Sequence, residues 1–196
     1  MAQYASILFS MILVNNFVLV KFLGICPFLG VSKKFDSAVG MGCAVTLVMV
    51  LAIAVTWPIQ RLLAAWGLEY LQTIAFILVI ATLVQLLDMA IKRYLPPLHA
   101  SLGVFLPLIT TNCSVLGVAI LTVDEGYSYP QALVAGLGAG LGFLLAMVLF
   151  SGVRRRVEEA APPEAFEGMP ITLISAAIVA MSFMGFSGVI DHLFGA

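Results

Sequence analysis

The chain has 196 residues, of which 62% are hydrophobic and only 10% are charged, and its mean hydropathy is +1.14. These values exclude an ordinary soluble domain and indicate an integral membrane protein surrounded by the lipid bilayer. The net charge of -1, with no basic run interleaved with aromatic residues, argues against a nucleic-acid partner. The sequence therefore predicts a single membrane domain over residues 1–196.

Six apolar windows follow one another along the chain, each long enough to cross the hydrocarbon as a helix of about 20 residues. They cover residues 4–31, 38–60, 68–91, 100–123, 130–152 and 170–190. Because lipid offers no partners to backbone amides and carbonyls, and the windows lack the alternation of barrel strands, we expect helices. The predicted fold class is an all-α integral membrane protein with six transmembrane helices. No positive charge precedes the first window, so we expect it to be retained and not cleaved as a signal.

Basic residues between the windows are concentrated in alternate connections. The connections after spans one, three and five hold Lys33, Lys34, Lys92, Arg93, Arg154, Arg155 and Arg156. Of the other two connections, one holds Arg61 and the next has no basic residue. Because cationic loops remain in the cytoplasm, we expect both termini on the outer side.

The motif Cys-x-x-Leu-Gly-Val occurs twice, at residues 26–31 and 113–118, with an offset of 87 positions. The segments "VGMGCA" (39–44) and "AGLGAG" (135–140) repeat with the similar offset of 96. We infer two three-span repeats, residues 4–91 and 100–190. Three crossings reverse the chain direction, so the second repeat is inverted relative to the first, and in such architectures we expect spans one and four to be broken near mid-membrane.

Residues that disfavour continuous helix surround both copies of the motif. They are Gly24, Pro27 and Gly30 in the first copy, and Pro107, Thr110, Thr111, Asn112 and Gly117 in the second. Proline removes a helical hydrogen bond, while threonine and asparagine can satisfy the freed backbone groups. Polar residues here, with Asn15 and Asn16, could instead line a cation path, although a role in helix packing is at least as well supported. The glycines at 136, 138, 140 and 142 form two pairs on opposite faces of span five and predict close helix packing.

The three cysteines receive different interpretations. Free cysteines in membrane helices are usually small, inert core residues, and we expect this of Cys43. Cys26 and Cys113 are related by the repeat and lie beside the predicted breaks, which suggests a shared ligand such as zinc, copper(I) or an iron-sulfur cluster. A tetrahedral thiolate site needs four donors, so the other pair must come from another chain. An iron-sulfur cluster would neutralise much of the thiolate charge in lipid and add redox function.

Two long segments identify a family. "LVNNFVLVKFLGICPFLGVSKK" (13–34) and "FLPLITTNCSVLGVAIL" (105–121), with "GFSGVI" (185–190), closely resemble the A-type membrane subunits of the Rnf (also called Rsx) ion-translocating electron-transport complexes. The chain is also similar to the D-type and E-type subunits of the sodium-pumping NADH:quinone oxidoreductase. The likeness extends over nearly the full chain.

The resemblance implies a role in electron transfer. In this family the A-type subunit pairs with a homologous E-type subunit of opposite membrane orientation, and the two chains hold a [2Fe-2S] cluster between them. Carried onto this sequence, the ligands are Cys26 and Cys113. The complex passes electrons between ferredoxin and NAD(H) through other subunits that carry iron-sulfur clusters and flavins, and couples this flow to movement of sodium ions or protons. The chain would be a relay in the bacterial inner membrane with periplasmic termini, a translocase component without catalytic residues of its own.

Other functions predict different features. The chain has no phosphate-binding glycine loop in a βαβ setting, so we expect it to bind no nucleotide or flavin by itself. The main alternative is a self-contained secondary transporter, because inverted repeats with broken helices are common in that class. A transporter would be expected to place polar or ionisable residues at the breaks, whereas the matched residues here are cysteines. A third possibility is a purely structural membrane component with incidental thiols.

Overall fold

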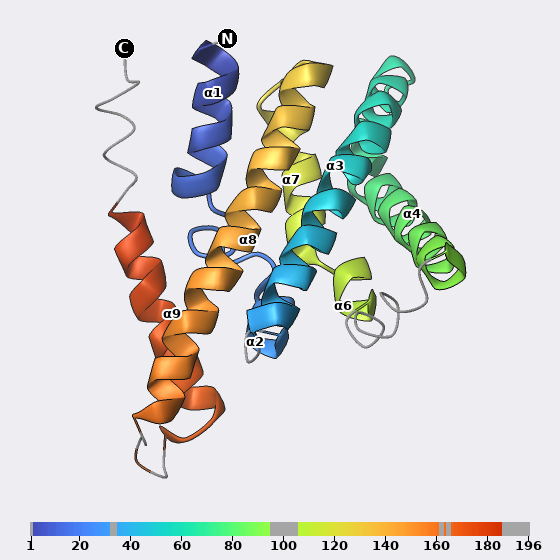
Figure 1. Ribbon diagram of the computed structural model, residues 1–196. Helices are drawn as coiled ribbons and strands as arrows, with labels where there is room; N and C mark the ends of the chain where they lie inside the picture. The colour runs from blue at the N-terminus through green and yellow to red at the C-terminus, as the bar shows by residue number, and fades with distance from the viewer. Residues whose placement is uncertain (1, 32–34, 95–105, 161–162, 164–165, 186–196) are drawn as a thin grey trace.

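The computed structural model describes residues 2–31, 35–94, 106–160, 163 and 166–185, and all regular structure in these ranges is helical. Its elements are α1 (Ala2–Phe9), the π-helical turn η1 (Ser10–Val14), α2 (Ile25–Val31), α3 (Phe35–Ala65), the 3-10 turn η2 (Glu69–Leu71), α4 (Gln72–Tyr94), α6 (Leu106–Thr110), α7 (Cys113–Asp124), α8 (Tyr129–Glu159) and α9 (Met169–Met184). The predicted all-α class is confirmed for the described residues. Successive long helices run in alternating directions, and α1 together with α2 descends beside α8 (Figure 1).

Within the described residues, three segments are long and apolar enough to cross a membrane: Phe35–Ala65, Glu69–Ala90 and Tyr129–Glu159. They coincide with the predicted windows 38–60, 68–91 and 130–152. The other three windows fall on the shorter apolar helices Gln3–Val14, Leu108–Asp124 and Met169–Met184, and parts of two of them, 100–105 and 186–190, lie outside the described residues. The grouping of the helices into two inverted repeats of three spans stays a prediction.

The centre of the molecule is the packing of α3 against α8 (Figure 1). A stripe of small residues lets the two backbones approach closely. A Cβ atom added at Gly140 of α8 would lie 2.7 Å from the Cα of Thr46 on α3, and one at Gly42 of α3 would lie 3.1 Å from the Cα of Leu144. Contact of this kind leaves no room for a larger side chain, so glycine sets the distance between the two helices.

The opposite face of α8 packs just as closely against the N-terminal helix. A Cβ atom at Gly138 would lie 3.0 Å from the Cβ of Met11, and one at Gly142 would lie 3.1 Å from the Met11 carbonyl oxygen. The glycine pairs at 136 and 140 and at 138 and 142 therefore face α3 and the α1–η1 segment respectively. The prediction of close packing on two opposing faces is confirmed.

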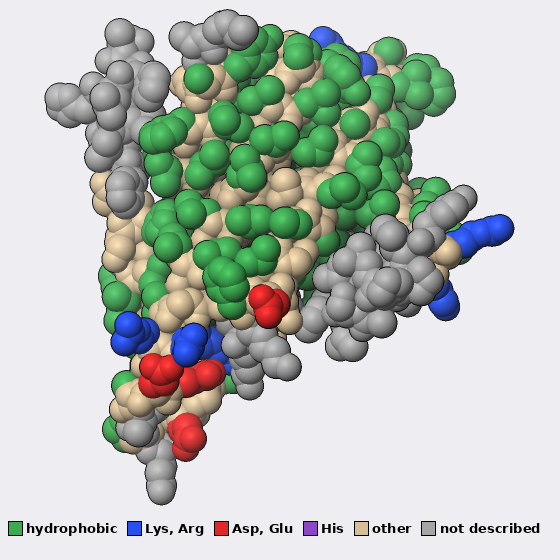
Figure 2. All heavy atoms as spheres, viewed as in Figure 1, with side chains coloured by type: hydrophobic (Ala, Val, Ile, Leu, Met, Phe, Trp, Pro, Cys, Tyr) green, Lys and Arg blue, Asp and Glu red, His purple; other side chains and the backbone are tan. Residues whose placement is uncertain are grey.

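The outer surface suits a lipid environment. Figure 2 shows a broad hydrophobic face over α3 and α8, with charged side chains at its margins. The exposed face of α4 carries Ile74, Ile77, Leu78, Leu86 and Met89. An apolar surface this extensive is rare on soluble monomers, and it agrees with a multi-pass membrane protein.

Candidate functional site

Helical structure stops after Val14 and resumes at Ile25, and Asn16 organises the segment between them. This side chain is fully buried. Its Oδ1 accepts hydrogen bonds from the amides of Val18 (3.0 Å) and Leu19 (3.2 Å). Its Nδ2 donates to the carbonyls of Ile12 (3.2 Å) and Gly142 (2.9 Å). Every hydrogen-bonding position of the amide is used within the protein, which supports the structural role of Asn16 over a place in a cation path.

The chain then turns into α2 through two residues with left-handed backbone angles. Phe22 has a φ of 56° and Gly24 a φ of 81°. Positive φ is uncommon for a bulky residue such as Phe22, so the surrounding contacts must hold it in place. Gly24 has a second constraint, since a Cβ atom there would overlap the Ser114 hydroxyl and lie 2.9 Å from Asn112 Oδ1. The end of the first interruption therefore lies directly against the second.

The second interruption consists of Thr111 and Asn112, between α6 and α7. Asn112 is the N-cap of α7, and its Oδ1 accepts a hydrogen bond from the Ser114 amide at 3.0 Å. The Ser114 hydroxyl donates to the Leu23 carbonyl at 2.8 Å, which joins the two interruptions across 91 positions of sequence. The Asn112 Nδ2 is buried and has no hydrogen-bond partner among the described residues.

Both predicted ligand residues lie where a helix resumes after an interruption. Cys26 is the second residue of α2, and Cys113 is the first residue of α7. Both are exposed at the surface of the isolated chain, and neither forms a disulfide. Since Leu23 and Ser114 are in direct contact, each cysteine lies within three residues of the junction between the two segments.

Of the prolines and glycines named as helix breakers, Gly24 lies in the first interruption and the others lie inside helices. Pro27 is the third residue of α2, and Pro107 is the second residue of α6. The first four amides of a helix have no partner within it, so proline is tolerated at these positions. Gly30 and Gly117 also lie within α2 and α7. The prolines therefore begin short helices, and the interruptions are held by side-chain hydrogen bonds from asparagine and serine.

The two cysteines form at most half of a metal site. In the described part of the chain, no group of three or more histidine, cysteine, aspartate or glutamate side chains is placed to hold a metal ion. His99 and His192 lie outside the described residues. A cluster with four thiolate ligands would thus need two more donors from a second chain, and the exposure of both thiols leaves them accessible to one.

Cys43 and Lys21 are two further exposed residues, and neither belongs to the proposed ligand pair. The prediction that Cys43 lies in the core is wrong: it is exposed and lines an apolar groove between α3 and α8 with Leu47 and Leu141. The buried face of α3 contains Met41, Gly42 and Val45, so position 43 turns away from it. Lys21, in the first interruption, is also exposed.

Comparison with known proteins gives consistent similarities. A family described as "Rnf-Nqr subunit, membrane protein" matches residues 4–190. The chain is 57% identical over 185 residues to the A-type subunit of the ion-translocating oxidoreductase complex of Syntrophotalea carbinolica, covering 94% of this chain and 96% of the relative. It is 57% identical over 183 residues to the A-type subunit of the Na(+)-translocating ferredoxin:NAD(+) oxidoreductase complex of Acetobacterium woodii, covering 93% and 95%. The A-type subunit of an ion-translocating oxidoreductase complex from an Azoarcus species is 50% identical over 193 residues, covering 98% and 100%.

Proposed function

We propose, because this chain belongs to the Rnf-Nqr family of membrane subunits, that it relays electrons within an ion-translocating ferredoxin:NAD oxidoreductase complex of the Rnf type. The membership confirms the resemblance predicted from the two cysteine motifs. In this proposal the chain is the A-type subunit of a redox-driven translocase in the bacterial inner membrane. It crosses the membrane six times, as two inverted repeats interrupted near mid-depth, with both termini periplasmic.

The observation that carries the proposal is the matched position of Cys26 and Cys113. Each is an exposed thiol at the start of a short helix, and the two interruptions that precede these helices are in contact. We propose that these two thiolates hold half of a [2Fe-2S] cluster and that two cysteines of a homologous E-type subunit of opposite orientation hold the other half. The donor set fits, because such a cluster takes four cysteine ligands and the described part of this chain offers two matched ones.

When bound, the cluster would accept and release one electron between redox centres on the two faces, across a hydrocarbon core of about 30 Å. The chain's own residues would hold the ligands and set the local polarity. Cys113 is the first residue of α7, a helix of 12 residues, so the positive end of the helix dipole lies next to this ligand. The amide donor of the adjacent Asn112, which has no partner in the part of the chain that the structure describes, adds a polar group next to this ligand. Hydrogen-bond donors near cluster sulfurs are one means by which proteins tune a reduction potential.

The relatives' names favour this function over a self-contained transporter. All three relatives described above are named as subunits of oxidoreductase complexes. The coupling to sodium ions or protons would therefore belong to the complex, whose other subunits would carry further iron-sulfur clusters and flavins. The complete internal hydrogen bonding of Asn16 gives no support to a cation path at the first interruption.

Iron and acid-labile sulfide in the purified complex test the ligand assignment. Cys26→Ser and Cys113→Ser should each lower both contents by the amount of one [2Fe-2S] cluster relative to the unmodified complex. Cys43→Ser is the matched control, because Cys43 is an exposed thiol of the same chain that lies in an apolar groove. It should leave both contents unchanged. Full retention of iron and sulfide in both ligand variants would reject the proposal.

A further inference from the structure

Helix α2, which carries Cys26, is too short to be stable by itself. It has seven residues, and isolated helices need roughly 12–15 residues before they become even marginally stable in water. Its position must therefore come from contacts with the rest of the protein. One contact is the stacking of Phe28 on Phe150 of α8, with ring centroids 4.2 Å apart and both side chains buried. Aromatic stacking fixes one point on α2 but leaves the end of the helix free to tilt.

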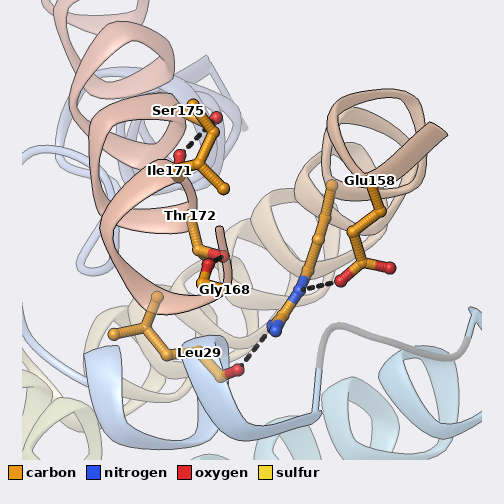
Figure 3. A network of polar contacts seen from close by, with 7 residues as sticks. Leu29, Glu158, Gly168, Ile171, Thr172 and Ser175 are labelled. Carbon is orange, nitrogen blue, oxygen red and sulfur yellow. Dashed lines mark hydrogen bonds and ion pairs between the residues drawn. The ribbon is translucent and has the colours of Figure 1, made fainter. Parts of the chain in front are cut away.

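Arg154, near the end of α8, provides a second contact at Leu29, the residue that follows Phe28 in α2. It is 5% exposed although it carries a charge. Its Nη1 donates to the Leu29 carbonyl at 2.7 Å, and its Nε donates to Glu158 Oε1 at 3.1 Å. In Figure 3, dashed lines mark these two bonds at the labelled residues Leu29 and Glu158.

The Leu29 carbonyl is a specific target. The last four carbonyls of a helix have no partner within it, and Leu29 is the third residue from the end of α2. A cation at this end also interacts favourably with the helix dipole, and a hydrogen bond from a charged donor is stronger than one between neutral groups. Burying an arginine is costly unless its donors are satisfied. The bonds to the Leu29 carbonyl and the Glu158 carboxylate offset part of this cost.

We infer that Arg154 is a positioning residue for Cys26. Its guanidinium holds the C-terminal end of α2 against α8, and with the Phe28–Phe150 stack it fixes where Cys26 lies relative to Cys113. Cys26 and Leu29 are three residues apart, so they lie on neighbouring positions of one helix face. The inference rests on the proposed function, in which Cys26 is a cluster ligand.

The neighbouring Arg155 is a matched control. It forms the same i,i+4 ion pair, with Glu159 at 3.2 Å, but its side chain is 82% exposed and its partner within the described part of the chain is Glu159 alone. Arg155→Ala therefore removes an equal charge and an equivalent pair without the bond to α2. Arg154→Lys keeps the charge but loses the planar guanidinium that bonds Leu29 and Glu158 at once.

The first measurement is the electron paramagnetic resonance spectrum and midpoint potential of the cluster in the intact complex. The second does not need the cluster. In the complex with Cys43→Ser and Cys113→Ser, Cys26 is the only thiol of this chain, and the proposed partner covers it. Its rate of alkylation by a membrane-permeant maleimide then reports how well α2 is held. Loss of a hydrogen bond to a charged group, about 1.5–3 kcal/mol, corresponds to an increase in rate of about tenfold or more.

We expect Arg154→Ala to speed alkylation about tenfold and to alter the spectrum and potential of the cluster. Arg154→Lys should change the same quantities less. Arg155→Ala should change neither the alkylation rate nor the cluster signal. Unchanged alkylation and an unchanged spectrum in Arg154→Ala would overturn the inference. If Arg154→Ala does not assemble, Arg154→Lys provides the test. Alkylation of Cys26 that is no faster in Arg154→Lys than in Arg155→Ala would overturn the inference. Faster alkylation in a complex whose unmodified form has no [2Fe-2S] signal would instead uphold the positioning role and reject the proposed function.

Discussion

The α3–α8 pair and the interrupted helices beside it are stabilised by different means. Helices α3 and α8 are each 31 residues long, and they pack through small residues with almost no polar contact. The helices at the interruptions have 5 to 12 residues and are held by hydrogen bonds from side chains to distant backbone groups. The long pair forms a scaffold, and the candidate ligands lie on short elements whose positions depend on a few polar contacts. Loss of packing should therefore unfold the protein, whereas loss of a polar contact should move the cysteines.

The largest expected effect comes from the scaffold. Gly140→Ala would place a methyl group 2.7 Å from the Cα of Thr46, and backbone atoms on two long helices cannot shift cheaply. We expect the free energy of unfolding in detergent to fall by about 3 kcal/mol, the upper part of the range for overpacking. Gly152 lies on the same helix, and a methyl group added there has nothing within 4 Å. Gly152→Ala should leave the free energy of unfolding unchanged or raise it by up to about 1 kcal/mol. Equal values for the two variants would mean that α3 and α8 are not in close contact.

A smaller effect is expected at the first interruption. Asn16→Ala leaves the buried amides of Val18 and Leu19 without acceptors and removes the bond to the Gly142 carbonyl. The expected loss in unfolding free energy is about 2 kcal/mol, with faster maleimide labelling of Cys26. Asn15→Ala is the control, since Asn15 bonds the Ser10 hydroxyl at 3.3 Å and is only half-buried. If Asn15→Ala lowered the free energy of unfolding as much as Asn16→Ala does, Asn16 would have no special role.

The smallest effect is expected where the two interruptions meet. Ser114→Ala removes the hydroxyl that donates to the Leu23 carbonyl, and we expect a loss of about 1 kcal/mol in unfolding free energy. Ser182→Ala removes an exposed hydroxyl that bonds Ile178 on the same helix, and this control should change stability by less than about 0.5 kcal/mol. Faster labelling of both Cys26 and Cys113 in Ser114→Ala alone would support the junction, and identical labelling in the two variants would contradict it.

The sequence predicts the scaffold better than the interruptions. Glycines four residues apart repeat with the helical turn, so the faces at 136 and 140 and at 138 and 142 can be assigned from spacing alone. Pro27 suggests a break but lies near the start of α2, where no amide donor is needed. The preceding segment is organised by Asn16, whose bond to Gly142 spans 126 positions. No local pattern reveals a contact over that distance.

The same limit applies to Arg154 and Cys43. The charge pattern identifies Arg154 only as one of three basic residues in a connection predicted to be cytoplasmic. In the structure it is buried and bonds the Leu29 carbonyl, 125 positions away. The expectation of a buried Cys43 comes from the frequent burial of free cysteines, yet the buried face of α3 passes through its neighbours. The proposed pairing of Cys26 with Cys113 comes from a repeated motif and stays a prediction.

The central claim is that Cys26 and Cys113 complete a cluster together with a homologous partner. The most direct test is the electron paramagnetic resonance spectrum of this chain purified with that partner alone, after reduction. The account predicts the signal of one [2Fe-2S] cluster per pair, absent when either Cys26→Ser or Cys113→Ser is introduced. A well-folded pair that gives no such signal, or one that keeps it in both variants, would contradict the account.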